Sequence, residues 1–208
     1  MKKLSALIWF VCVALAANAQ KFEGGFTGGL NLSQLDGDML SGYHKAGING
    51  GIWVSYPFND KWSAGIEFLY TQKGALRQID ENNIAATFAF DKFKLNYIEV
   101  PVYGGFTYKK FTGQFGLTGG YLLGAKVEDF AGIRDYKTKL KPFETGILLG
   151  LSYPINKKLA AQLRWQYTIS SLAKGDNRNI FTDNGFSRVI LGLYNNLLSV
   201  NLKYSLNK

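Results

Sequence analysis

The sequence is short of the residues on which most catalytic and metal sites depend. It has one cysteine and one histidine among 208 residues. The cysteine, Cys12, falls in an N-terminal segment that reads as a secretory signal, so the exported chain has no thiol for a disulfide, a nucleophile or a thiolate metal ligand. One histidine is too few for a His/Cys zinc site. We therefore expect no metal site, no cofactor, no catalytic residues and no enzymatic activity.

Long apolar runs and dense blocks of charge are also lacking. After the N-terminal segment, no apolar run reaches the roughly 20 residues that a spanning helix needs. The formal net charge of +9 includes Lys2 and Lys3 of that segment, and the remaining charge is spread without long Lys/Arg blocks. This pattern argues against nucleic acid as a partner, because such proteins carry a densely basic face.

The N-terminal segment has the three parts of a secretory signal. Lys2 and Lys3 precede an apolar run over 4–17, and Ala17-Asn18-Ala19 forms a small-x-small cleavage site. We predict a signal peptide over 1–19 and a mature domain over 20–208. An uncleaved membrane anchor is the alternative. The bulky Val11 before Cys12 argues against a lipoprotein signal.

Alternation of apolar and polar residues dominates the rest of the chain. It predicts eight strands, over 22–33, 45–56, 62–71, 97–106, 114–123, 143–153, 159–170 and 198–206. Three connectors are short, whereas the four over 35–44, 74–92, 127–141 and 172–195 are long. Short turns at one end and long loops at the other are typical of outer-membrane barrels. The sequence predicts an all-β fold, an eight-stranded antiparallel up-and-down transmembrane β-barrel.

A soluble, lipocalin-like barrel has the same number of strands but the opposite apolar face. Two features favour the membrane barrel. The more polar face is rich in glycine, which makes room for large side chains inside a narrow barrel. The apolar face carries aromatic residues near strand ends, as expected at membrane interfaces. These aromatic residues are Tyr56, Trp62, Tyr70, Tyr153, Tyr167 and Tyr204.

Charged residues recur on the face that this interpretation turns inward. They are Glu67, Glu99, Glu144, Arg164, Lys45, Lys126 and Lys203. A charge in a narrow lumen is costly unless it is paired. We predict that Arg164 is the hub of a lumenal cluster with Glu67, Glu99 and Glu144 that closes the barrel. A proton relay or a catalytic pair is the alternative.

Two segments repeat the same phrase, SYPFNDKWSAGIEFLYT at 55–71 and SYPINKKLAAQLRWQYT at 152–168. Eight of the seventeen aligned positions are identical, and Glu67 aligns with Arg164. Each copy reads as a strand end, a tight turn and a second strand. Because both residues lie equally far from their turns, we expect them at similar heights in the barrel.

Three stretches carry a family resemblance, namely GGLNLSQLDGD at 28–38, KAGINGGIWVSYPFNDKWSAGIEFLYTQKGA at 45–75 and LNYIEVPVYGGFTY at 95–108. They resemble the PorT-like outer-membrane β-barrel family of Bacteroidetes. The resemblance implies an outer-membrane location after export, and some members of that family are accessories of protein secretion. Such barrels often end in an aromatic residue that the insertion machinery reads. This chain ends in Lys208, and Tyr204 is its candidate for that signal.

The leading functional prediction is a small, non-enzymatic outer-membrane barrel with a structural or partner-binding role. Expected partners are outer-membrane lipid and lipopolysaccharide, the insertion machinery, and a secretion-system or cell-surface protein. A narrow channel for small molecules is the first alternative. The second is a loop-borne acyltransferase-type enzyme using His44 beside Asp36 and Asp38, although one histidine without a motif is more often a solvated loop residue.

Overall fold

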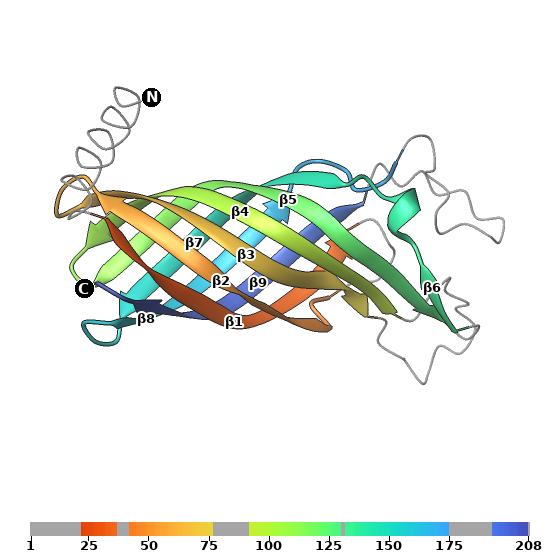
Figure 1. Cartoon of the computed structure of the whole chain (residues 1–208), viewed down its shortest axis with the longest axis horizontal. Coiled ribbons are helices and arrows are strands. Elements are labelled where there is room, and N and C mark those ends of the chain that lie inside the picture. Colours follow the sequence, from red (N-terminus) through yellow and green to blue (C-terminus); the bar gives the residue numbers. More distant parts are fainter. Residues whose placement is uncertain (1–21, 37–41, 77–91, 130–131, 175–192, 208) are drawn as a thin grey trace, which may run out of the picture.

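The computed structural model describes residues 22–36, 42–76, 92–129, 132–174 and 193–207. Eight long strands form a closed antiparallel barrel (Figure 1). They are β1 (Glu23–Asp36), β2 (Lys45–Pro57), β3 (Trp62–Leu76), β4 (Lys92–Tyr108), β5 (Phe111–Asp129), β7 (Phe143–Pro154), β8 (Leu159–Thr168) and β9 (Tyr194–Ser205). The predicted fold is confirmed. The predicted signal peptide, 1–19, lies outside the described residues.

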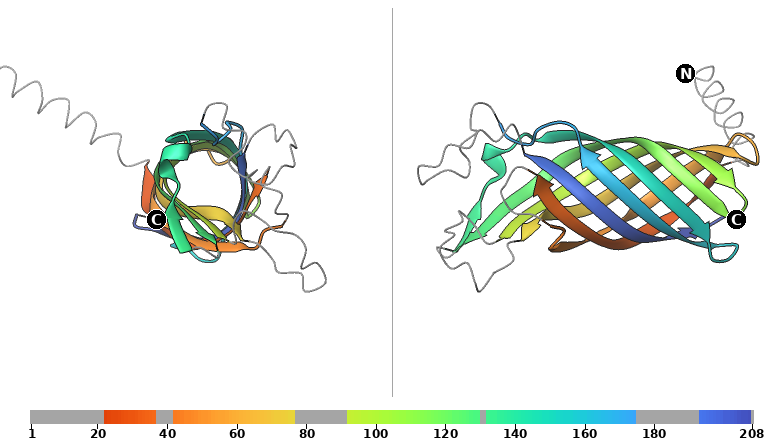
Figure 2. Two further views of the ribbon diagram at one scale, coloured as in Figure 1. Left: turned by 90° about the vertical axis from the view of Figure 1, so that its right-hand side faces the viewer. Right: turned by 180° about the vertical axis from the view of Figure 1, so that it is seen from behind.

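Each long strand pairs with its neighbour in sequence. The order runs β4-β3-β2-β1-β9-β8-β7-β5, and pairing of β4 with β5 completes the ring (Figure 2). The first and last strands pair over most of their length, from Gly25 opposite Ser205 to Asp36 opposite Tyr194. Closure leaves the eight-stranded wall without a free edge, as an up-and-down barrel requires.

Two smaller elements stand at the loop end. The short β6 (Gly132–Asp135) pairs with the end of β5, and the 3-10 helix η2 (Lys137–Lys139) follows it. Among the described residues, no helix is long and apolar enough to cross a membrane. Both β4 and β5 reach further toward the loop end than the sequence predicted, because pairing continues to Lys92 opposite Glu128. The β4–β5–β6 hairpin therefore projects past its neighbours (Figure 1).

The outer surface of the barrel is apolar and the interior is polar. Large aliphatic side chains such as Leu30, Leu117 and Val200 are more than 60% exposed, whereas charged and amide side chains are buried inside. This arrangement is the reverse of a soluble barrel and matches a membrane barrel, whose outer face contacts lipid. The prediction of a membrane barrel rather than a soluble barrel is thereby confirmed.

Inward-facing glycines leave space for large neighbours. A Cβ atom added at Gly65 would lie 2.5 Å from the ring of Tyr103. One added at Gly120 would lie 2.8 Å from Cγ of Glu144. The outward-facing Gly119, by contrast, has nothing within 4 Å of such an atom. Glycine on the inner face thus admits the side chains that fill the lumen.

A β-bulge interrupts the pairing of β4 with β5. Tyr97 lies opposite Leu122, but Asn96 lies opposite Gly124, so β5 contains one extra residue. An extra residue reverses the inward and outward alternation beyond it. Lys126 is therefore exposed on the outer face, and the prediction that it points inward is wrong.

The two copies of the repeated phrase form the β2–β3 and β7–β8 hairpins. In the first turn, Oδ1 of Asn59 accepts hydrogen bonds from the backbone N–H groups of Lys61 and Trp62, both at 2.9 Å. In the second, Oδ1 of Asn156 accepts them from Lys158 and Leu159, both at 2.8 Å. The shared residues thus form the same turn twice.

Candidate functional site: the barrel interior

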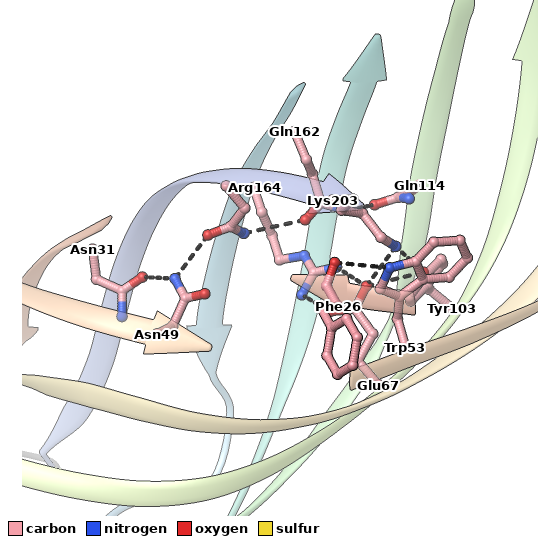
Figure 3. Close-up of polar contacts among 11 residues, drawn as sticks. Phe26, Asn31, Asn49, Trp53, Glu67, Tyr103, Gln114, Gln162, Arg164 and Lys203 are labelled. Carbon is pink, nitrogen blue, oxygen red and sulfur yellow. Dashed lines mark hydrogen bonds and ion pairs between the residues drawn. The ribbon is translucent and has the colours of Figure 1, made fainter. Parts of the chain in front are cut away.

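Glu67 and Arg164 form a bidentate ion pair inside the barrel. The Nη1 and Nη2 atoms of Arg164 donate to the two carboxylate oxygens of Glu67, each at 2.9 Å. Lys203 donates to the same carboxylate at 3.0 Å, and so does the Tyr103 hydroxyl. The Lys203 ammonium also lies 4.4 Å from the centre of the Trp53 ring. We call Glu67, Arg164, Lys203 and Tyr103 the turn-side cluster (Figure 3).

A chain of amide side chains crosses the lumen beside this cluster (Figure 3). Gln162 donates to Gln114 at 2.7 Å, and Asn201 donates to Gln162 at 3.1 Å. Asn49 then donates to both Asn201 and Asn31. The chain joins β5, β8, β9, β2 and β1 through buried hydrogen bonds, so it ties opposite walls of the barrel together.

A second charged group lies nearer the long loops. The Lys73 ammonium donates to Glu99 and, at 2.6 Å, to Glu144. Asn195 donates to the other oxygen of Glu144 at 2.7 Å, and the Tyr97 ring centre lies 5.2 Å from the Lys73 ammonium. We call Lys73, Glu99, Glu144 and Asn195 the loop-side cluster. Lys73 is six residues beyond Glu67 on β3, which is about 20 Å along the strand.

The predicted lumenal cluster is therefore divided in two. The structure brings Glu67 together with Arg164, whereas Glu99 and Glu144 share Lys73. The sequence reading missed Lys73 because it ended the third strand at Thr71. Continued alternation from Glu67 through Leu69 and Thr71 was the signal that would have placed Lys73 inside.

The two clusters have complementary charge. The turn-side cluster has two cations and one carboxylate, and the loop-side cluster has one cation and two carboxylates. Together the six charges balance. Each carboxylate touches a cation directly, which is the arrangement that buried charges require.

An apolar layer fills the lumen between the loop-side cluster and the loop end. Strands β1, β3, β4 and β5 supply most of it, and three further leucines come from outside those strands. Its buried members are Leu35, Ala75, Phe93, Leu95, Tyr97, Leu122, Ala125, Val127, Leu140, Leu172 and Leu193. The sequence predicted a polar lumen and did not predict this layer.

Backbone hydrogen bonds join the three segments that carry the added leucines, next to the ends of β7, β8 and β9. Lys141 N–H donates to the carbonyl of Leu172 at 2.8 Å, and Leu172 N–H donates to the carbonyl of Leu193 at 2.8 Å. Leu140 also forms a β-bridge with Ala173. These segments thus continue the pairing of neighbouring strands beyond the ends of β7, β8 and β9, and their leucines are buried in the apolar layer.

Aromatic residues of the outer surface form two belts. The turn-end belt includes Tyr56, Trp62, Tyr153 and Tyr204, and Trp62 packs on Phe106 with ring centres 4.8 Å apart. The loop-end belt includes Tyr70 and Tyr167. Tyr167 stacks between Trp165 and Tyr194 at 6.0 and 6.2 Å, and Tyr121 packs on Phe143 at 5.1 Å. Such belts mark the two membrane–water interfaces.

Among the residues that the structure describes, no acid pairs with the proposed loop histidine. His44 is exposed. Asp36 accepts hydrogen bonds from Gln34 at 2.7 Å and Asn196 at 3.3 Å. Asp38 lies outside the described residues. Within those residues, no group of three or more His, Cys, Asp or Glu side chains is placed to hold a metal ion.

Comparison with solved structures supports the fold. Over 89% of this chain and 99% of the other, the structure is similar to Ail, the attachment invasion locus protein of Yersinia pestis, with 15% identity and a TM-score of 0.51. It is also similar to Neisserial surface protein A, with 14% identity and a TM-score of 0.51 over 88% and 96% of the two chains. At these identities the likeness concerns the fold alone.

Among curated protein sequences, none matches this chain. A family model does match, over residues 18–174, and its description is the outer membrane protein beta-barrel domain. The match includes seven of the eight long strands. With the apolar outer face, the two aromatic belts and the closed ring of strands, it shows that the chain belongs to the outer membrane protein beta-barrel family.

Proposed function

We propose that this outer-membrane barrel is a non-enzymatic protein with a closed lumen and a partner-binding loop end. The observation that carries the proposal is the apolar layer. Leu140, Leu172 and Leu193 share one buried cluster with residues such as Phe93 and Leu95, and all of them are at most 3% exposed. Ions do not cross a dry apolar constriction readily. The paired clusters beneath it form a second barrier.

Planar-bilayer recordings test closure. We expect no current steps from the wild-type protein. Leu172→Gln alone should stay closed because the two clusters remain, and Arg164→Ala/Lys73→Met should stay closed because the apolar layer remains. The triple variant Leu172→Gln/Arg164→Ala/Lys73→Met should conduct. Steps from the wild-type protein would overturn the closed-lumen proposal, and a silent triple variant would show that these two barriers do not account for closure.

A narrow channel is the second candidate, and one observation favours it. Among the described residues, several buried lumenal atoms have no protein hydrogen-bond partner, including Thr71 Oγ1, Arg164 Nε and Gln166 Nε2. Buried polar atoms of this kind usually bind water. A hydrated lumen would conduct small solutes if the apolar layer moved aside. Current steps that disappear when Leu140 is cross-linked to a barrel strand would favour this candidate.

The projecting β4–β5–β6 hairpin supports a partner at the loop end. Ile133 on β6 is 63% exposed beyond the barrel wall. A secretion-system or cell-surface protein is the partner class that the PorT-like resemblance suggests, and accessory function in secretion is the finer form of this proposal. A photo-cross-linker placed at Ile133 in intact outer membranes should capture a discrete partner. The same probe at Ile155, in a turn, is the control.

A further inference from the structure

The outer face of the β4–β5 hairpin carries a row of lysines. Phe93, Leu95, Ala125 and Val127 are buried in the apolar layer, so the alternating residues between them face outward. Lys94 lies directly opposite Lys126, and Lys92 lies directly opposite Glu128. Without the bulge at Asn96 and Tyr97, Lys126 would point into the barrel. The bulge therefore adds Lys126 to the two lysines of β4 and completes this basic row.

The opposed lysines repel each other. Like charges directly opposite one another on adjacent strands destabilise a sheet. Glu128 offsets part of the repulsion, since its carboxylate forms an ion pair with the Lys94 ammonium at 3.0 Å. Among the described residues, no carboxylate forms an ion pair with Lys92 or Lys126. Asp135 lies opposite Lys126 in register, but its Oδ1 accepts the backbone N–H of Lys137 at 2.8 Å. The row retains excess positive charge.

The height of the row relates it to the membrane. Ile98 lies opposite Tyr70 and Tyr121, both near the loop-end aromatic belt. Lys94 is four residues beyond Ile98, about 13 Å along the strand and about 10 Å in height at a tilt of about 40°. Hydrogen-bonded polar residues fill the interval, where the Tyr70 hydroxyl donates to Asn96 at 3.1 Å. The lysines thus stand above the acyl chains, at the level of headgroups and inner sugars.

We propose that Lys92, Lys94 and Lys126 bind the phosphate groups of lipopolysaccharide in the surrounding outer leaflet. The side chains face sideways from the barrel wall, toward lipid, rather than into the lumen. A phosphate between Lys94 and Lys126 would relieve their repulsion and draw Lys94 from Glu128. The site is independent of whether the lumen conducts.

The test measures lipopolysaccharide binding to purified protein refolded in nanodiscs. Each lysine near an anionic lipid surface contributes about five-fold in affinity. Lys94→Gln/Lys126→Gln should therefore raise the Kd about 25-fold. Dephosphorylated lipopolysaccharide should bind the wild-type protein with a similar loss, and the double variant should lose little more. Glu128→Gln should bind at least as tightly as wild type, because it removes a competing carboxylate. Heat-modifiable gel migration confirms that each variant is folded.

Two lysines at the turn end provide the matched control. Lys157→Gln/Lys158→Gln removes the same charge from the opposite rim and should leave the Kd unchanged. Unchanged binding by Lys94→Gln/Lys126→Gln would overturn the proposal. Displacement by millimolar inorganic phosphate would identify a free-phosphate site, and equal affinity for phosphatidylglycerol would identify a general headgroup site. Either result would also overturn it.

Discussion

Glu67 on β3 and Arg164 on β8 meet across the lumen through two parallel hydrogen bonds. Their side chains are 0% and 1% exposed, and they occupy corresponding positions in two copies of one hairpin phrase. Repetition of the hairpin places the two residues at the same height in the barrel. Because their charges are opposite, they can pair directly at that height. The pair links strands that are not neighbours in the barrel wall, so it resists flattening of the barrel as well as burying two charges.

Arg164→Ala should destabilise the barrel strongly. Glu67 would keep Lys203 and Tyr103 but lose its bidentate partner, and removal of one member of a buried pair costs about 3–5 kcal/mol. Urea unfolding in lipid vesicles measures the change. Replacing both partners, as Glu67→Gln/Arg164→Met, should recover part of the loss. An unchanged urea midpoint for Arg164→Ala would contradict the assignment.

Lys73→Met should destabilise the barrel by a similar amount, about 3–5 kcal/mol. The substitution leaves Glu99 and Glu144 buried beside each other without a cation. The triple variant Lys73→Met/Glu99→Gln/Glu144→Gln removes all three charges and should be more stable than Lys73→Met alone. The same unfolding assay compares them. If the triple variant is the least stable, repulsion between the two carboxylates is not what destabilises Lys73→Met.

Most of the fold could be predicted from the alternating pattern, but the loop end could not. Alternation identified all eight strands because every strand has one lipid face and one lumen face. It failed beyond Leu95 and Leu122, where the alternation continues with the opposite polarity: Phe93 and Val127 face the lumen, and charged residues face outward. The bulge added a second difficulty. One extra residue in β5 changes no local propensity, yet it turns Lys126 outward.

The contacts inside the barrel could be predicted only in part. Arg164 and Glu67 could be matched through the repeated phrase. Lys73 lay one alternation beyond the predicted strand end. Glu99 and Glu144, which pair with Lys73, were therefore assigned to Arg164 instead. Leu140 and Leu172 carry no periodic signal, because they lie outside the strands. Only the backbone pairing beyond the ends of β7, β8 and β9 brings them to the apolar layer.

Gly65→Ala should be destabilising by about 1–3 kcal/mol, as expected for overpacking. The added methyl group would meet the Tyr103 ring at 2.5 Å. Gly119→Ala is the matched control, since its methyl group would face outward with nothing within 4 Å. In a Tyr103→Leu background, Gly65→Ala should become nearly neutral. Equal effects of Gly65→Ala in both backgrounds would show that Tyr103 is not the obstacle.

The two repeated turns should respond alike to loss of their asparagine. Asn59→Ala and Asn156→Ala each remove a side-chain acceptor from two backbone N–H groups, and each should lower the free energy of unfolding by about 1 kcal/mol. Lys157→Ala changes the same turn without removing such an acceptor and should have little effect. A large difference between the two asparagine variants would show that the copies are not energetically equivalent.

The position of the bulge in β5 determines which residues of this strand face the lumen. Before it, even-numbered residues of β5 face the lumen, and after it, odd-numbered residues do so. Loss of one residue at Leu123 would exchange the two sets, so that Lys126 and Glu128 would enter the apolar layer while Ala125 and Val127 faced outward. Substitutions at Leu123 do not change which residues of β5 face inward and which face outward. Over evolutionary time, this short stretch should therefore tolerate changes of residue far more readily than changes of length.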